Sequence, residues 1–164
     1  MGLVEQRIRL RIVRAWERRS STTNAVVEAG FLGTDSNGDA IHVQIQPRAL
    51  HIHKHLIIEG SIYILSNFRV TMPQVRFVAV TTQMMIWLQR TSIINPIRGD
   101  ISIYPEHWFD LNSETRLDQM VDEERFLAGM VVRRSINGNH LISCYATRLY
   151  INLPTNETAM VNAL

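Results

Sequence analysis

Charged and apolar residues alternate along the first predicted element, residues 7–16, whose sequence is RIRLRIVRAW. The apolar positions Ile8, Leu10 and Ile12 fall on one side and arginines on the other, which is the pattern of a strand with one buried and one solvated face. The doublet Ile12-Val13 interrupts this alternation and indicates a bend or a β-bulge. Arg14 and Trp16 remain two positions apart beyond it, so they are expected to share a face with Arg18.

Four further strands and one helix follow in the next 75 residues or so. The predicted strands cover residues 25–34, 40–46, 62–65 and 75–89, and the predicted helix covers residues 48–58. The segment DSNGD at residues 35–39 predicts a tight turn, because Asn-Gly readily supplies positive φ angles. Pro47 suits the first turn of the helix, and Glu59-Gly60 ends it.

The order of these elements predicts the fold class. Five short strands with one short helix between the third and the fourth is the arrangement of the OB-fold, a five-stranded Greek-key barrel. Closure of the barrel removes the strand edges that would otherwise pair with other chains. We therefore expect an all-β protein whose first domain, residues 1–94, is an OB barrel.

The character of the sequence changes after the barrel. Residues 95–125 read as a linker with a possible short acidic helix at 112–121. Residues 126–164 read as a β-hairpin, in which strands 126–136 and 140–151 flank the tight turn Asn137-Gly138. A lone hairpin is only marginally stable in water, so it must pack on the barrel, pair with another chain or stay loose.

The net charge of +2 conceals a strong asymmetry. Residues 1–99 carry 12 basic and 6 acidic side chains, whereas residues 100–164 carry 5 basic and 9 acidic ones. Nearly all of the positive charge is arginine, which binds phosphate through two hydrogen bonds and stacks on bases. The basic half suggests a module that binds polyanions, although the two halves could also simply neutralise each other.

Cysteine usage and hydropathy constrain the compartment. Cys144 is the only cysteine, which excludes an internal disulfide. No apolar run approaches the ~18 residues of a membrane span, and the arginine-rich N-terminus does not resemble a signal peptide. We therefore expect a cytosolic or nuclear protein with no membrane association.

The histidines and carboxylates do not form a convincing catalytic or metal site. His51 and His55 are four apart on the predicted helix, a spacing that can hold zinc, but no glutamate lies between them and no third ligand follows. No nucleophile elbow, phosphate-binding loop or paired carboxylate motif is present in the sequence. We therefore expect a protein that is not an enzyme, with no cofactor and no metal.

Three segments of the first domain resemble a known family. They are residues 12–16 (IVRAW), 35–43 (DSNGDAIHV) and 59–68 (EGSIYILSNF). They are similar to segments of the DNA-binding OB domains of the replication protein A large subunit, in its plant-expanded branch. Residues 126–132 and 144–152 (CYATRLYIN) resemble the first and last strands of a further OB domain whose middle is missing, which suggests a truncated second domain.

The resemblance implies that the protein binds single-stranded DNA in the nucleus, during replication, repair or recombination. The implied binding residues are Arg14, Trp16, Arg18, His42, Asn67, Arg69, Arg76 and Phe77. Trp16 and Phe77 would stack on bases, although aromatic residues in strands are more often part of a core. Gln46 departs from the family, which has an aromatic residue at the end of the third strand.

Several alternatives remain open at this stage. Arg7, Arg9 and Arg11 could either contact phosphates or merely solvate a strand face. The barrel could bind single-stranded RNA or partner proteins instead of DNA. The implied partners are single-stranded DNA and replication protein A-type subunits, with self-association through the C-terminal hairpin as a further possibility. The acidic residues 118–124 could form a solvated helix end or compete with DNA for the basic surface.

Overall fold

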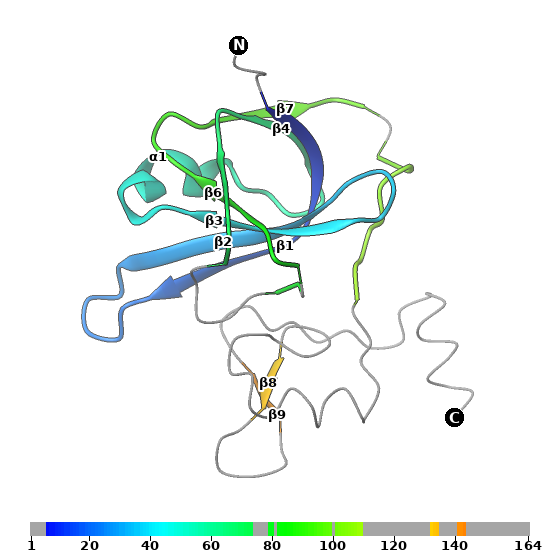
Figure 1. Ribbon diagram of the computed structural model, residues 1–164. Helices are drawn as coiled ribbons and strands as arrows, with labels where there is room; N and C mark the ends of the chain where they lie inside the picture. The colour runs from blue at the N-terminus through cyan, green and yellow to red at the C-terminus, as the bar shows by residue number, and fades with distance from the viewer. Residues whose placement is uncertain are drawn as a thin grey trace.

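The computed structural model describes residues 6–73, 79–80, 82–99, 101–109, 132–134 and 141–143. For the last two segments only the backbone is described. The described chain is almost entirely β-structure with one short helical segment, and it has the OB-fold that the sequence predicts. Figure 1 shows the sheet curling round on itself, with the helical segment at one end.

Seven strands form the main sheet in the order β5-β6-β3-β2-β1-β4-β7. They are β1 (Arg7–Arg19), β2 (Val26–Thr34), β3 (Ala40–Ile45), β4 (Ile62–Ser66), β5 (Arg69–Thr71), β6 (Met85–Leu88) and β7 (Ile93–Ile97). The pair β3–β6 is parallel and the other pairs are antiparallel. The long, curved β1 pairs with β4 along its first half and with β2 along its second half (Figure 1).

The two ends of this sheet are joined by very short connections. Only Asn67 and Phe68 separate β4 from β5, and residues 89–92 separate β6 from β7. Asn67 makes the bend with a positive φ of 53°, and its side-chain amide donates a hydrogen bond to the carbonyl of Thr91 at 2.8 Å. The strands β4 and β5 therefore act as one bent strand that pairs with β6 and β7, which brings the sheet round towards closure.

A bulge in β1 marks the point where the strand changes partner. The register with β2 shifts between Ile12 and Arg14, which confirms the interruption that the doublet Ile12-Val13 predicts. The turn at residues 59–61 fills this position: Gly60 N donates to the carbonyl of Ile12, and Ala15 N donates to Glu59 Oε1, both at 2.7 Å. Gly60 adopts a φ of 81°, which glycine allows without strain.

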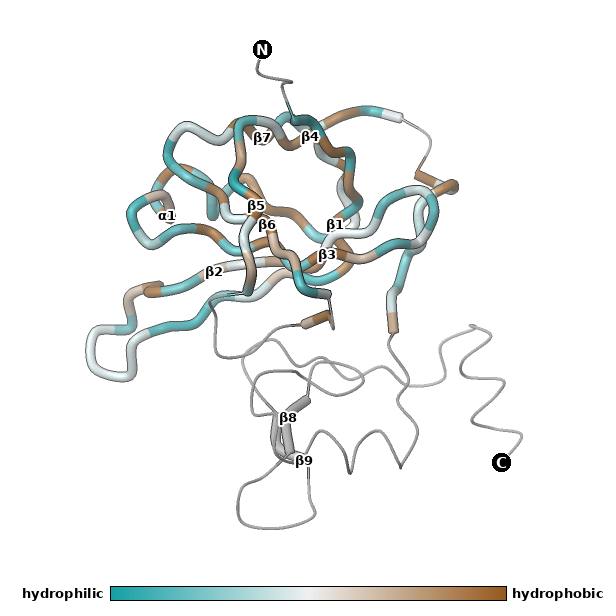
Figure 2. The backbone as a smooth tube through the Cα atoms, viewed as in Figure 1, coloured by the Kyte–Doolittle hydropathy of each residue, from teal (hydrophilic) through white to brown (hydrophobic). Residues whose placement is uncertain are grey.

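The main core lies inside the curled sheet. Its buried side chains come from alternate positions of the strands, as the period-two pattern requires. They include Leu10, Ile12, Phe31, Val43, Leu65, Ile86 and Leu88. Figure 2 shows hydrophobic and hydrophilic segments alternating around the sheet. Leu50 and Ala49, from the helical segment, pack against the same core.

The predicted fifth strand is wrong over most of its described residues. Among the described residues of 75–89, only Met85–Leu88 is a strand, because Ala79 and Val80 pack on the outside of the sheet instead. The strands β5 and β7 were missed. Pro96 indicates a linker in the sequence, but it lies in β7, the last strand of the sheet. Proline has no backbone N–H, and an edge strand tolerates this because its free side pairs with no further strand of that sheet. β7 also runs past the predicted domain boundary at residue 94.

The helix is shorter and more broken than the predicted 48–58. It consists of the 3-10 turn η1 (Pro47–Ala49), α1 (Leu50–His53) and the 3-10 turn η2 (Lys54–Leu56). No side chain caps the start of any of these pieces. The helical segment ends at Leu56, because Ile57 is already extended, so the prediction that Glu59-Gly60 ends the helix is wrong. Gly60 instead lies in the turn before β4. The turn at 35–39 is confirmed: Gly38 has a φ of 89°, and Asp35 Oδ1 accepts the N–H groups of Asn37 and Asp39.

A second sheet of two strands confirms the pairing of the C-terminal hairpin. It contains β8 (Val132–Arg134) and β9 (Leu141–Ser143), which are antiparallel, with Arg133 opposite Ile142. The turn Asn137-Gly138, the acidic helix at 112–121 and the acidic residues 118–124 lie outside the described residues.

Candidate nucleic-acid interface

A row of residues crosses five neighbouring strands on the outer face of the sheet. Strand register sets Trp16 opposite Gly30, Gly30 opposite Gln44, Gln44 opposite Trp87, and Trp87 opposite Arg69. Register partners point to the same side of a sheet, and the neighbouring positions Ile86 and Leu88 point into the core. The row therefore places two indoles, an amide and a guanidinium on the outer side of the sheet, where Trp16 and Gln44 are buried and Trp87 and Arg69 reach solvent.

Trp16 lies on the outer face as predicted, but its expected exposure is wrong. The indole is only 6% exposed and belongs to a second apolar cluster with Val13, Leu32, Ala79 and Val80, against which Trp108 packs. Gly30 lets the ring lie across β2, since a Cβ there would meet Trp16 Cζ2 at 3.1 Å and Gln44 Oε1 at 2.8 Å. The sequence cannot reveal this cover, because Ala79, Val80 and Trp108 are more than 60 positions away.

His42 is placed beside Trp16 on the same face. It stands opposite Leu32 in β2, and its ring meets the Trp16 indole edge to face, with centroids 5.1 Å apart. The imidazole is almost completely buried. Burial lowers the pKa of His42 from its ordinary value of 6.5, while the hydrogen bond with Gln44 and the charge of Glu28 partly oppose that shift. His42 is therefore neutral at pH 7.

A chain of polar contacts runs along the outer face and fixes the state of His42. Arg18 Nε donates to Glu28 Oε2 at 2.7 Å, and Gln44 Nε2 donates to Glu28 Oε1 at 3.2 Å. Gln44 Oε1 must then accept from His42 Nε2, at 3.0 Å. His42 Nδ1 is left as the acceptor for the backbone N–H of Ala79, at 3.2 Å. The network therefore specifies the neutral tautomer with its proton on Nε2.

The predicted arginines on β1 are paired with carboxylates. Arg14 Nη1 contacts Glu59 Oε1, and this carboxylate also accepts from Ala15 N. The side chain of Arg18 is half exposed in its pair with Glu28. Exposed ion pairs of this kind contribute only ~0–1 kcal/mol, so a phosphate can compete with Glu28 for Arg18. Arg14 is more enclosed, and its pair helps to hold the bulge in β1.

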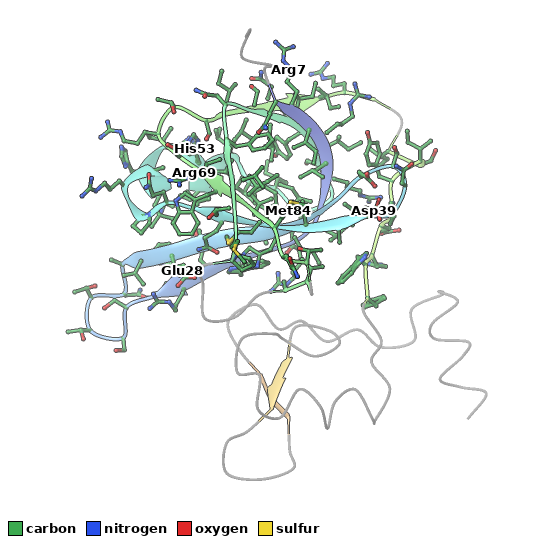
Figure 3. The ribbon with its side chains drawn as sticks, in the orientation of Figure 1. Arg7, Glu28, Asp39, His53, Arg69 and Met84 are labelled. Carbon is green, nitrogen blue, oxygen red and sulfur yellow. The ribbon has the colours of Figure 1, made fainter. Side chains whose placement is uncertain are left out.

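The remaining predicted residues divide into three groups. Arg69 is exposed at the end of the row. Asn67 is exposed, but its amide is used in the β4–β5 bend. Arg76 and Phe77 lie outside the described residues. Figure 3 labels Arg69 on the short strand in front and Glu28 on β2 below it.

Sequence reasoning missed Trp87, the second aromatic side chain of the row. It is half buried in β6, between Gln44 and Arg69. Ile86, Trp87 and Leu88 are all apolar, so the sequence has no polar–apolar alternation that would assign an outward direction to Trp87, and the strand was predicted to begin ten residues earlier.

The first half of β1 holds a different set of arginines. Arg7 and Arg9 are exposed, whereas Arg11 is buried and donates from Nη1 to the carbonyl of Tyr104 at 3.1 Å. Arg11 therefore anchors the segment after β7 and does not solvate the strand face.

Other classes of site find little support in the described part of the chain. No group of three or more His, Cys, Asp or Glu side chains there is arranged to hold a metal ion. Within the same residues, no helix has both the length and the apolar character needed to cross a membrane. His51 and His55 are exposed, but His53 between them is buried, with Nε2 at 2.7 Å from the carbonyl oxygen of Gln89.

Comparison with one solved structure supports the fold. No protein-family model and no curated protein matches the sequence. A chain of a replication protein A heterotrimer bound to single-stranded DNA is similar in structure, with a TM-score of 0.53 and 17% identity over 70% of this chain and 27% of that one. An OB domain from Methanosarcina mazei, solved by solution NMR, matches with a TM-score of 0.44 and 16% identity over 63% of this chain and 81% of that one.

Proposed function

We propose that this protein binds single-stranded DNA, without catalysis, along the row that runs from Trp16 to Arg69. One observation carries the proposal: strand register aligns two tryptophans, a glycine, an amide and an arginine across five strands. Bases of any sequence stack on aromatic rings, and arginine binds backbone phosphates. A curled β-face with these groups suits an extended strand better than it suits a compact substrate.

The two halves of the row make different contributions. Trp87 and Arg69 are accessible and supply the first stacking platform and a phosphate contact. Trp16 supplies the second platform once Ala79 and Val80 move from it. Each stacked base contributes ~1–3 kcal/mol, so two platforms with a few phosphate contacts give weak, salt-sensitive binding by a single barrel.

The biological setting is part of the same proposal. The resemblance of residues 12–16, 35–43 and 59–68 to replication protein A supports a role in replication, repair or recombination in the nucleus. It also supports replication protein A-type subunits as partners, and pairing of the C-terminal hairpin with a second copy as a route to self-association. The match to the heterotrimer chain spans only 27% of that chain, so these roles belong to the proposal.

A fluorescence-anisotropy titration tests the proposal directly. The probe is a labelled oligothymidylate of about 20 nucleotides, which exceeds the site of one OB barrel. We expect saturable binding at about 50 mM salt that weakens steeply as salt is added. A duplex of the same length should compete poorly. Absence of binding at low salt would reject the proposal, and tighter binding of oligouridylate would assign the groove to RNA.

A protein-binding role is favoured by one specific observation. Val70, Met72 and Met84 are exposed apolar side chains at the β5–β6 pair, next to the row. Figure 3 shows Met84 at the start of β6. Substitution of Met72 and Met84 by Gln would abolish a protein complex formed there while leaving DNA affinity unchanged.

A further inference from the structure

The half of the row around Trp16 is covered by the chain itself. Ala79 and Val80 come from the segment between β5 and β6, and both are buried in the cluster with Val13, Trp16 and Leu32. The half around Trp87 and Arg69 carries no such cover among the described residues. A strand that occupied the whole row would have to displace Ala79 and Val80.

One hydrogen bond connects this cover to a titratable group. The backbone N–H of Ala79 donates to His42 Nδ1 at 3.2 Å. His42 can accept there only in its neutral form, because the proton on Nε2 is directed to Gln44. Gln44 is held in turn by Glu28, so it cannot rotate to offer a second arrangement without losing that contact.

We propose that His42 is a pH-sensitive latch, which holds Ala79 and Val80 over Trp16 when neutral and releases them when protonated. The inference rests on the proposed function, since it describes the regulation of the same groove. A proton on Nδ1 would face the N–H of Ala79, so an acceptor–donor contact becomes a contact between two donors. The network offers the new proton no acceptor, because Gln44 Oε1 already receives the proton on Nε2.

Proton linkage gives the direction of the switch. The covered state binds the proton poorly, because burial lowers the pKa of His42. The open state exposes the imidazole to water, and its pKa returns towards 6.5. The open state therefore binds more protons, and falling pH favours it. The imidazolium that is released also adds a positive charge to the groove, which attracts phosphates.

The charged groups around His42 leave this direction unchanged. Glu28 on β2 raises the pKa of His42, and Arg18 on β1 is paired with Glu28. Residues 79–84 contain no titratable side chain. On the third side, Trp108 packs on the cluster and follows Glu106 and His107. His107 is thus the second histidine to control for, and His107→Asn provides that control.

Nuclear magnetic resonance tests the latch without any DNA. The ring nitrogen shifts of His42 report its protonation, and hydrogen exchange of the Ala79 amide reports opening. Protection of Ala79 should fall by up to tenfold per pH unit between pH 6.5 and the lower pKa of covered His42, because one proton links the two states over that interval. A ring that stays neutral down to about pH 4.5, or Ala79 protection that ignores its titration, would overturn the proposal.

A variant separates the latch from general effects of pH. His42→Asn places an amide oxygen near Nδ1, so it can accept from Ala79 N but cannot titrate. Its Ala79 protection should stay high throughout, and loss of protection at the same pH as in the wild type would contradict the latch. His107→Asn should behave as the wild type.

The titration with oligothymidylate distinguishes failure of the latch from failure of the proposed function. Wild-type affinity should rise more between pH 7.5 and pH 5 than that of His42→Asn, because only the wild type gains access to Trp16. Equal rises in both proteins would refute the latch while leaving DNA binding intact. If Ala79 opens with pH but no DNA binds at either pH, the latch stands and the proposed function fails.

Discussion

Trp16 and His42 meet edge to face on the outer surface of the sheet, with ring centroids 5.1 Å apart and 76° between the ring planes. The contact joins the only aromatic residue of β1 to the imidazole that accepts a hydrogen bond from the backbone N–H of Ala79. Trp16 is therefore both a candidate base platform and part of a closed apolar cluster. Binding of single-stranded DNA to Trp16 therefore depends on whether this cluster opens, and not only on which residues line the outer face.

Trp87→Ala tests the accessible platform. Removing the indole should weaken binding of single-stranded DNA by ~1–3 kcal/mol, which is about 5-fold to 150-fold in Kd. Trp87→Phe keeps a stacking surface and should retain most of the affinity. Anisotropy titrations measure both variants, and thermal unfolding confirms that they are folded. Unchanged affinity in a folded Trp87→Ala protein would remove Trp87 from the interface.

Arg69→Ala tests the phosphate contact at the end of the row. We expect the slope of log K against log salt to decrease by about 0.7, the value for one phosphate contact on a single strand. Arg48→Ala is the matched control, because Arg48 is also an exposed arginine but lies on η1 outside the row. If both substitutions changed the slope equally, the effect of Arg69 would be nonspecific.

Gly30→Ala tests the close packing around Trp16. The new Cβ would meet the backbone oxygen of Val43 and Gln44 Oε1, both at 2.8 Å, and overpacking of this kind destabilises a protein by ~1–3 kcal/mol. Gly99→Ala is the control, since a Cβ there has no neighbour within 4 Å. Urea unfolding measures both. Equal stability of the two variants would show that Trp16 does not need Gly30 beneath it.

Stability should fall as the solution is acidified below pH 6.5. His42 has its ordinary pKa of 6.5 in the unfolded chain and a lower pKa in the folded protein. The unfolded state therefore binds more protons in the interval between these two values, and the free energy of unfolding decreases there. His42→Asn should show a shallower decrease over the same interval. Parallel curves for the two proteins, measured by urea unfolding, would mean that His42 is not the group responsible.

The sequence was sufficient for the fold class and for the direction of the side chains on β1. Alternation assigned Arg14, Trp16 and Arg18 to one face, and the interruption at Ile12-Val13 marked the bulge, because both features depend only on local periodicity. The turn at 35–39 was equally predictable, because its hydrogen bonds stay within five residues.

The features that were missed depend on contacts between distant segments. The burial of Trp16 needs Ala79, Val80 and Trp108, and the pair Arg14–Glu59 spans 45 positions. The strand β7 contains Pro96, which local rules assign to a linker and which only a position at the sheet edge permits. Trp87 was missed for a related reason. Its place in the row follows from the strand register with Gln44 and Arg69, and its neighbours in the sequence do not indicate it.

The most direct test of the groove is a titration of the isotope-labelled protein with oligothymidylate, followed through the indole N–H signal of Trp87 and the backbone amides of Gly30 and Gln44. We expect these three signals to shift together and to saturate at the same ratio of oligothymidylate to protein, because all three residues lie on one line across the sheet. Saturable binding that leaves them unmoved, and shifts residues elsewhere, would contradict the account.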